Sequence, residues 1–369
     1  MIGMTGVLPF LPLYVVELGV SKADAPTWAG IIAAAPFIMA ASLTPIWGVL
    51  GDKYGQKPMV LRAVLGLGVT VTLMGFAPNV VVLLILRLVQ GAASGFIAAN
   101  NAFVSSQTPT EKAGYALAML QTSLSAGSIL GPLVGGTLGD AVGFRWAFVL
   151  VGVLCLISFV VVYYRVHEDR SKQTALPGRL RKNLELVYRD RGLRSLLFIL
   201  FAGQAAVVLT APIFPFYLEQ LGAPEELLAT LAGAAVSITG VSTIFSAPFW
   251  GKRSDRKGYK TTMIVVTAII ACGMFAQAWI PWYGWIYPLR LLIGLAVGAL
   301  LPLTYAELTR RVPDGRRGGI MGLASSATLM GNFTGPLVCS VIVGHLPVRY
   351  AFVASALVMT GVHVMARRS

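Results

Sequence analysis

Charge is scarce in this sequence. Only 12% of the 369 residues are charged, whereas 56% are hydrophobic, 40 are glycine and the mean hydropathy is +0.75. A water-soluble domain carries about twice that share of charged residues. The composition therefore predicts a protein whose solvent is a lipid bilayer, in which glycines let transmembrane helices approach closely.

Residues that carry catalysis, metal binding or disulfides are also few. Cys155, Cys272 and Cys339 lie in separate apolar stretches without a C-x-x-C pair, so neither a disulfide framework nor a metal site is indicated. No G-x-x-x-x-G-K-[ST] phosphate loop is present, and the three histidines belong to no Ser/His/Asp arrangement. We predict that the chain is not an enzyme, does not hydrolyse ATP, and uses no cofactor or metal.

The apolar stretches are about 20 to 25 residues long, which is enough to cross ~30 Å of hydrocarbon as helices. We predict an all-α membrane protein with twelve transmembrane helices, six in each of two bundles. The predicted spans are 1–19, 27–50, 59–77, 80–104, 113–139, 145–165, 194–220, 227–251, 261–280, 284–308, 318–344 and 349–366. The predicted division is an N-terminal bundle at 1–165, a cytoplasmic linker at 166–192 and a C-terminal bundle at 193–369.

The two halves are repeats of each other. PIWGVLGDKYGQK from Pro45 matches PFWGKRSDRKGYK from Pro248 at an offset of 203 residues, and LRLVQGAASG from Leu86 matches LRLLIGLAVG from Leu289. Beyond these segments the offset is 204, as in FRWAFV and VRYAFV. A constant register predicts duplication and pseudo-two-fold symmetry. Arg194 begins the first predicted helix of the second repeat, and at the offset of 203 residues its counterpart would precede Met1. We therefore expect the first helix to begin earlier than this sequence does.

Basic residues lie mostly on one side of the predicted helices. Of the 29 Lys and Arg, 24 fall in one set of loops, three (Lys22, Arg145, Arg349) in the other, and Arg87 and Arg290 within spans. The positive-inside rule places the first set in the cytoplasm, with both termini. This asymmetry explains the net charge of +14 without a nucleic-acid partner.

Three segments stand out as candidate functional motifs. The turn after the second span contains Gly48, Asp52, Gly55 and Lys57, and it recurs with Asp255, which favours a gating role over a purely topological one. Arg87 and Arg290 occupy equivalent positions within spans, where an arginine is costly unless it faces protein or water, although snorkelling to the interface is the alternative. The fifth span carries small residues and a proline that permit bending and close packing: Gly127, Gly131, Pro132, Gly135 and Gly136.

These motifs resemble those of the major facilitator superfamily, and within it the twelve-helix drug:proton antiporter family. GVLGDKYGQK resembles the family's loop between helices 2 and 3, with Gln56 in place of the usual basic residue. Arg87-x-x-Gln90-Gly91 resembles a helix 4 motif linked to proton coupling, and the glycines of the fifth span resemble the exporter motif of helix 5. PFLPLYVVELG from Pro9 and the run of loops resemble those of the MdtG-like multidrug exporters. The resemblance implies a monomeric antiporter of a bacterial inner membrane, driven by the proton gradient.

We expect a secondary transporter that exports amphipathic drugs or similar small molecules by rocking its two bundles around a midplane site. Export of one dedicated metabolite or siderophore is the alternative within transport, and a non-transporting receptor or scaffold is the alternative from another class. Counting to the middle of each span gives the expected binding residues: Phe37, Gln121, Ser125, Phe214, Thr239, Met330 and Asn332.

No acidic residue falls near the centre of a predicted span. A proton-coupled transporter needs a group that loads and releases a proton near neutral pH, and a partly buried carboxylate serves this purpose. We therefore predict that Asp52 or Glu307, near helix ends, exchanges the proton and that Arg87 modulates it. A site with two arginines and no central acid is expected to prefer neutral, zwitterionic or anionic substrates.

Overall fold

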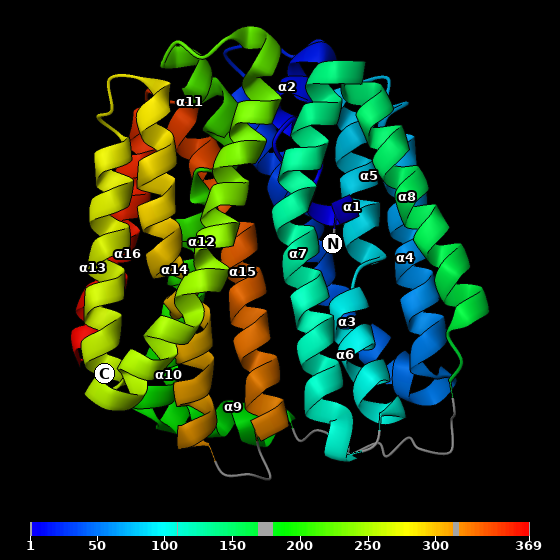
Figure 1. The fold of residues 1–369 in the computed structure, drawn as a ribbon, viewed down its shortest axis with the longest axis vertical. Helices are drawn as coiled ribbons and strands as arrows, with labels where there is room; N and C mark the ends of the chain where they lie inside the picture. Colours follow the sequence, from blue (N-terminus) through cyan, green and yellow to red (C-terminus); the bar gives the residue numbers. More distant parts are fainter. Residues whose placement is uncertain (1, 109, 169–179, 313–316, 369) are drawn as a thin grey trace.

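All regular elements in the described part of this computed structural model are helices (Figure 1). The structure describes residues 2–108, 110–168, 180–312 and 317–368, with the backbone alone for some helical residues, Asp52 among them. The first half contains α1 (Ile2–Thr5), α2 (Leu11–Glu17), α3 (Ala25–Tyr54), α4 (Gln56–Met74), α5 (Val80–Ala92), α6 (Phe96–Gln107), α7 (Thr110–Val142) and α8 (Phe144–Arg165). The second half contains α10 (Arg191–Leu209), η2 (Ala211–Ile213), α11 (Phe214–Gln220), η3 (Glu225–Leu227), α12 (Leu228–Lys257), α13 (Tyr259–Gln277), η4 (Tyr283–Trp285), α14 (Ile286–Arg311), α15 (Arg317–Val343) and α16 (Arg349–Arg368), and α9 (Leu180–Arg189) lies between the halves.

The helices form two bundles of six membrane crossings. Within the described residues, nine helical segments are long and apolar enough to span a membrane. The remaining crossings are α1 with α2, α5 with α6, and α7. We call the end of the bundles at which α9 lies the linker end and the opposite end the distal end (Figure 1). The prediction of twelve helices in two bundles is confirmed.

The first helix of each repeat is interrupted near its prolines. Regular helix stops at Thr5 and resumes at Leu11 in the first repeat, while the second repeat has the short 3-10 turn η2 between α10 and α11. Pro9 and Pro212 occupy equivalent places in these interruptions, where a proline removes a backbone donor. The first helices of both repeats are therefore interrupted at equivalent positions.

The fourth helix is interrupted in only one repeat, which the sequence did not predict. It breaks between α5 and α6, where Gly95 has a φ of +101°. The Trp47 indole donates to Ala92 O at 2.8 Å, and Arg62 Nη2 donates to Ser94 O at 2.9 Å while its guanidinium stacks 3.5 Å from the Trp47 ring. These donors satisfy carbonyl groups that the break releases. In the second repeat Val265 takes the place of Arg62, and α14 is continuous.

Equivalent side chains in the two repeats make equivalent contacts. The Tyr14 hydroxyl donates to Met74 O at 2.8 Å, and the Tyr217 hydroxyl donates to the carbonyl of Gln277, 203 residues further on in both cases. The Trp250 indole donates to Leu295 O at 2.5 Å, which repeats the contact of Trp47 with Ala92. Such repeated long-range contacts confirm the predicted pseudo-two-fold relation.

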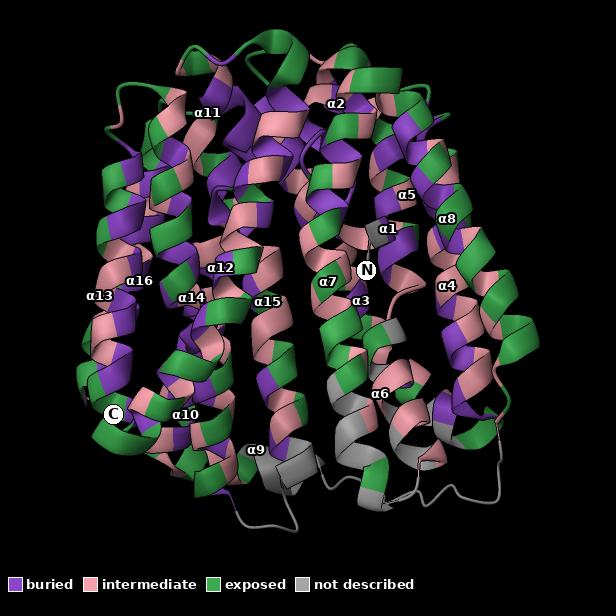
Figure 2. Ribbon diagram, in the orientation of Figure 1, coloured by how far each residue is buried: buried purple, intermediate pink, exposed green. Residues whose placement is uncertain are grey.

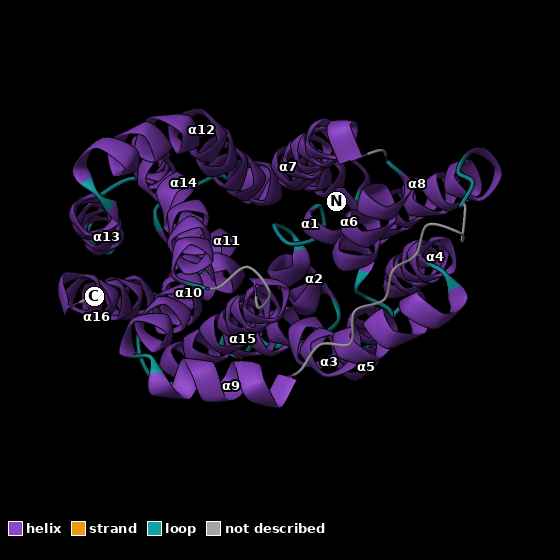
Figure 3. Ribbon diagram, turned by 90° about the horizontal axis from the view of Figure 1, so that it is seen from below, coloured by secondary structure: helices purple, strands orange, loops and turns teal. Residues whose placement is uncertain are grey.

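The bundles meet along two pairs of helices on opposite sides of the molecule. Figure 3, seen from the linker end, shows α7 beside α12 and α3 beside α15. A Cβ added to Gly30 would collide with the Pro336 carbonyl, and one added to Gly233 would collide with the Pro132 carbonyl. These two contacts exchange under the pseudo-two-fold axis, because Gly30 corresponds to Gly233 and Pro132 to Pro336. The interface therefore requires glycine at both symmetry-related crossings.

The distribution of buried and exposed residues follows the packing of the helices into two bundles. Buried residues gather where helices face one another within each bundle and at the distal end (Figure 2). Large apolar side chains cover outward faces, among them Phe245 (78% exposed) and Leu357 (67% exposed). Apolar side chains exposed along helices of this length are the surface that a bilayer covers.

Candidate functional site

Two buried arginines mark the interior of the bundles. Arg87 on α5 is 3% exposed and Arg290 on α14 is 7% exposed. Within the described residues neither forms an ion pair, and the Nε atoms of both lack a hydrogen-bond partner. A buried cation without a carboxylate costs several kcal/mol or more, so a protein retains it only where the charge has a use. The burial of both residues argues against snorkelling.

The partners of the two arginines differ between the repeats. Arg87 Nη1 donates to Gln90 Oε1 at 3.0 Å, whereas the residue equivalent to Gln90 is Ile293. Arg290 Nη2 donates to Thr210 Oγ1 at 3.4 Å, and its guanidinium lies 4.3 Å from the centre of the Phe214 ring. The predicted site residue Phe214 is thus buried beneath Arg290, where the aromatic face stabilises the cation.

The expected binding residues lie on helices of both bundles. Gln121 on α7 donates to Asn101 Oδ1 at 3.2 Å, and Asn332 on α15 accepts from Gln204 at 2.9 Å. Thr239 donates to Ala235 O within α12. Phe37, Ser125, Thr239 and Asn332 are half-buried, Phe214 is buried, and Gln121 and Met330 are exposed. The structure distributes these residues over both bundles, and their role in binding stays a prediction.

Polar contacts join the two bundles near the distal end. Ser340 Oγ donates to Thr27 O at 2.9 Å, and Ser237 Oγ donates to Ile129 O at 2.6 Å. Lys22 Nζ donates to Glu219 Oε1 at 2.8 Å across the bundles. That hydrogen bond raises the pKa of the Lys22 ammonium above its ordinary value, and the charges of Glu219 and Glu225 add to the effect.

An acid that belongs to none of the sequence motifs also joins the bundles. Asp140 Oδ2, on α7, accepts from the backbone N–H of Thr230 at 2.7 Å, in the first turn of α12. A carboxylate at a helix N-terminus satisfies a free donor and interacts favourably with the helix dipole. The signal available in the sequence was an acid four residues after Gly136, but no sequence pattern identifies a capping partner in another bundle.

Toward the linker end the same interface helices carry exposed polar side chains. Gln121 and Ser123 on α7, and Ser325 and Ser326 on α15, are exposed. Figure 1 shows α12 leaning away from α7 in this direction. Polar residues exposed within membrane-spanning helices face water or protein rather than lipid. The bundles are therefore joined near the distal end, and polar side chains are exposed on the linker side.

The glycine and proline motif of the fifth helix serves packing on two sides. A Cβ at Gly135 would collide with the Gly6 carbonyl beside α1, and a Cβ at Gly136 would collide with the Ala229 carbonyl of the other bundle. Gly127 O accepts a hydrogen bond from Thr5 at 3.3 Å, while Gly131 and Pro132 are buried. The motif thus combines packing within the first bundle with contact between bundles.

The turn between α3 and α4 is held by a residue from the start of the linker. The Glu168 carboxylate accepts from the backbone N–H groups of Gln56 at 2.6 Å and Lys57 at 3.1 Å, which are the first two residues of α4. Gly55, with a φ of +102°, makes the turn, and Gly48 lies on the exposed side of α3. The Asp52 side chain lies outside the described part of the structure.

Two other predicted acids form ion pairs at the linker end. Arg310 Nη2 donates to Asp255 Oδ1 at 2.8 Å, and Arg311 Nε donates to Glu307 Oε1 at 2.7 Å. The Glu307 side chain is only 15% exposed, whereas that of Asp255 is 66% exposed. Glu307 is therefore the better shielded of the two, although its proposed proton exchange stays a prediction.

Comparison with known proteins agrees with this architecture. The family model of the Major Facilitator Superfamily matches residues 1–282 and 196–368. Multidrug resistance protein MdtG of Salmonella dublin is 35% identical over 356 residues, covering 95% of this chain and 87% of that protein. The MdtG protein of Proteus mirabilis is 32% identical over 361 residues, covering 97% and 89%.

Solved structures share the fold at low sequence identity. A single-site mutant of the nucleoside transporter NupG superimposes with a TM-score of 0.81 at 14% identity, covering 100% of this chain and 97% of that one. A bacterial homologue of the human lysosomal transporter Spinster superimposes with a TM-score of 0.78 at 15% identity, covering 100% and 93%. The chain belongs to the Major Facilitator Superfamily, and it is a multi-pass secondary transporter of small molecules rather than an enzyme.

Proposed function

We propose that this transporter exports amphipathic drugs or similar small molecules in exchange for protons. The observation that carries the proposal is the interface between the bundles, which is joined by hydrogen bonds and close glycine contacts near the distal end and has exposed polar residues on the linker side. Rocking of two bundles about such an interface gives a central site access to alternate sides. The drug-resistance names of the relatives supply the substrate class.

The linker end faces the cytoplasm in this proposal. Of the 29 basic residues, the 24 that fall in one set of loops define this end, and the positive-inside rule assigns them to the cytoplasm with both termini. The membrane is then a bacterial inner membrane, and the protein acts as a monomer in the bilayer. The moving units are residues 1–165 and 193–369, joined by the linker at 166–192.

The charge of the interior favours a particular group of substrates. Arg87 and Arg290 are buried without a carboxylate among the described residues, and Gln121 and Asn332 add uncharged polar groups. An uncompensated positive field repels dications and accepts neutral, zwitterionic or anionic molecules. Substrate contact with both bundles would link binding to rocking.

Proton exchange is assigned to Asp52 or Glu307, with Arg87 modulating the exchange. Glu307 is shielded from solvent and held by Arg311, so protonation would release an ion pair at the linker end. Release of that pair would loosen the end of α14 and couple the proton to the motion of the second bundle. No resident cofactor takes part, because the proton gradient supplies the energy.

Two measurements test this proposal. Cells with and without the gene are loaded with a panel of neutral, anionic, zwitterionic and dicationic compounds, and efflux is followed. Export of several chemically unrelated members supports a drug exporter, whereas export of one compound alone indicates a dedicated metabolite or siderophore exporter. Absence of any gene-dependent efflux favours a receptor or scaffold.

The coupling is tested in inverted vesicles under an imposed pH gradient. Gradient-driven uptake that is lost in Asp52→Asn or Glu307→Gln supports the assignment. Uptake that survives neutralisation of both acids refutes it, and preferential uptake of permanent dications refutes the charge argument.

A further inference from the structure

The distal end carries three basic side chains, and two of them are neutralised. Lys22 pairs with Glu219 at 2.8 Å, and Arg145 pairs with Glu17 at 3.1 Å. Arg349 forms no ion pair with any described residue. It faces aromatic rings instead, with its guanidinium 5.4 Å from the centre of the Trp279 ring.

Comparison of the two repeats explains why Arg349 has no counter-ion among the described residues. Arg145 and Arg349 occupy equivalent positions at the offset of 204 residues, at the start of α8 and α16. The residue equivalent to Glu17, at the offset of 203, is Gln220. The second repeat therefore has the arginine of the pair and a neutral amide in place of its carboxylate.

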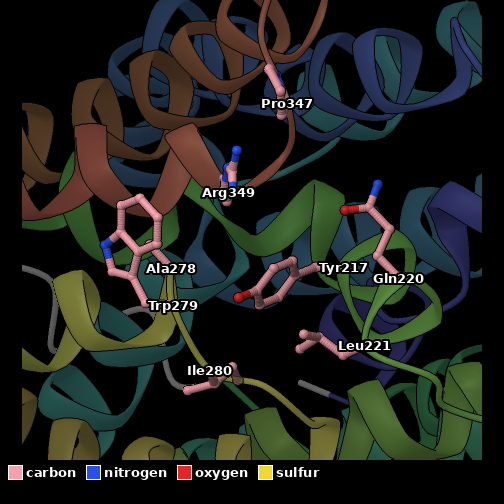
Figure 4. A pocket seen from close by; sticks show the side chains of 8 residues that line it. All are labelled: Tyr217, Gln220, Leu221, Ala278, Trp279, Ile280, Pro347 and Arg349. Carbon is pink, nitrogen blue, oxygen red and sulfur yellow. The ribbon is translucent and has the colours of Figure 1, made fainter.

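A cavity of about 350 Å³ lies around this arginine (Figure 4). Gln220, Tyr217, Trp279 and Ile280 line it together with Arg349, and no acidic residue belongs to the lining. The Tyr217 hydroxyl donates to the carbonyl of Gln277, so the remaining polar side chains of the lining are the Arg349 guanidinium, the Gln220 amide and the Trp279 indole. One cation, neutral donors and no acid favour a singly charged anion.

The surroundings place the cavity at the depth of lipid headgroups. Trp279, Trp282 and Trp285 lie at and beyond the distal end of α13, and all three are more than half exposed. Exposed tryptophans gather at the boundary between hydrocarbon and water. Phe275, one turn deeper on α13, is also exposed and offers an apolar surface to an acyl chain.

We propose that the cavity at Arg349 binds the phosphate of an anionic phospholipid from the distal leaflet. The guanidinium and the Gln220 amide hold the phosphate oxygens, the Trp279 ring covers the headgroup, and the acyl chains run along the outer face of α13. The ligand supplies the negative charge that Glu17 supplies to Arg145 in the first repeat. The binding site is peripheral, on the second bundle alone, and it is separate from the transport pathway between the bundles.

The test counts lipids that remain bound to the purified full-length protein. The protein is extracted, exchanged into detergent with phosphatidylglycerol or phosphatidylcholine, and examined by native mass spectrometry. Gln220→Glu restores the acid of the first repeat while keeping Arg349, and Arg349→Gln removes the cation. Loss of a charge-assisted contact is expected to weaken retention of one phosphatidylglycerol by about tenfold in both variants. Arg145→Gln, at the paired position, serves as the matched control and is expected to retain lipid as the unmodified protein does.

Three results would overturn the inference. Equal retention of phosphatidylglycerol by the unmodified protein and by Gln220→Glu shows that the unpaired arginine selects nothing. An equal loss in Arg145→Gln shows a general effect of surface charge. Thermal stabilisation by inorganic phosphate or glycerol phosphate as large as that by phosphatidylglycerol shows a site for soluble anions rather than lipid.

Discussion

The two repeats share their scaffold contacts and differ in their charged contacts. Tyr14 and Tyr217 cap equivalent carbonyl groups, and Trp47 and Trp250 do the same at the other end of the bundles. By contrast, Arg87 pairs with Gln90 while Arg290 lies against Phe214. Contacts that build the fold have stayed equivalent, whereas charged positions have acquired different surroundings. The difference indicates that the bundles share a scaffold but contribute different chemistry.

The largest effect is expected where the bundles touch most closely. Gly30→Leu and Gly233→Leu each place a side chain against a carbonyl of the other bundle. Overpacking of ~1–3 kcal/mol shifts the balance of conformations by roughly 5- to 150-fold, away from the state joined at the distal end. Transport by intact cells should fall to near the background level in both variants.

Gly361→Ala is the control, because no atom lies within 4 Å of the added Cβ. It is expected to transport normally at equal expression. Loss of transport in only one of the two leucine variants would show that the crossings are not equivalent.

Replacement of the two buried arginines is expected to lower transport and to distinguish the roles of the two repeats. Arg87→Gln and Arg290→Gln each remove an uncompensated buried charge, so folding is preserved or improved, while transport falls by roughly 10-fold or more. The substrate preference should move toward cations in both cases.

The two variants should differ in pH dependence. Because Arg87 is assigned a role in proton coupling, Arg87→Gln is expected to change the pH profile of transport, and Arg290→Gln is expected to keep it. Identical pH profiles for both variants would contradict different roles for the two arginines.

A moderate effect on local stability is expected where Asp140 of the first bundle caps the N-terminus of α12 in the second. Asp140→Asn removes the charge that faces the first turn of α12, and charge at a helix end contributes about 0.3–1 kcal/mol. Hydrogen exchange in that turn should therefore rise by up to roughly fivefold. Asp24→Asn, which removes a distal carboxylate bonded only locally to Ser21, is the matched control.

The smallest effect is expected at the repeated tyrosines. Tyr14→Phe and Tyr217→Phe each remove one hydroxyl from a buried carbonyl, at a cost of ~1 kcal/mol. For a chain of this length the midpoint of thermal unfolding in detergent should fall by about 1 °C in each variant. A shift several times larger in one repeat would show that the scaffold contacts are not equivalent.

The sequence predicted the fold because its signals are periodic or repeated. Apolar stretches gave the crossings, and a constant offset aligned Tyr14 with Tyr217 and Pro9 with Pro212. It did not predict the break at Gly95, because a glycine in a helical pattern marks a break only where partners satisfy the released carbonyls, as Arg62, which the second repeat lacks, does here.

The site was less predictable, because it depends on which side chains meet. Glu168 and Asp140 lie away from the centres of the predicted spans, and their partners are backbone N–H groups far away in the chain. Helix rotation was also undetermined, so the sequence could not distinguish the exposed Gln121 from the buried Phe214. That Arg87 and Arg290 face the interior could be predicted, since an arginine within a span is costly unless it faces protein or water. Their partners could not.

The central claim is that the two bundles rock about their interface, so that one end opens as the other closes. Spin labels at Val142 and Leu227 report on the distal end, and labels at Met119 and Phe249 report on the linker end, on helices α7, η3 and α12. Distances measured by double electron–electron resonance in nanodiscs, with and without a transported compound and at two pH values, test the claim. Rocking predicts that the distal distance lengthens whenever the linker-end distance shortens. Distances that stay fixed at both ends, or that change in the same direction, would contradict it.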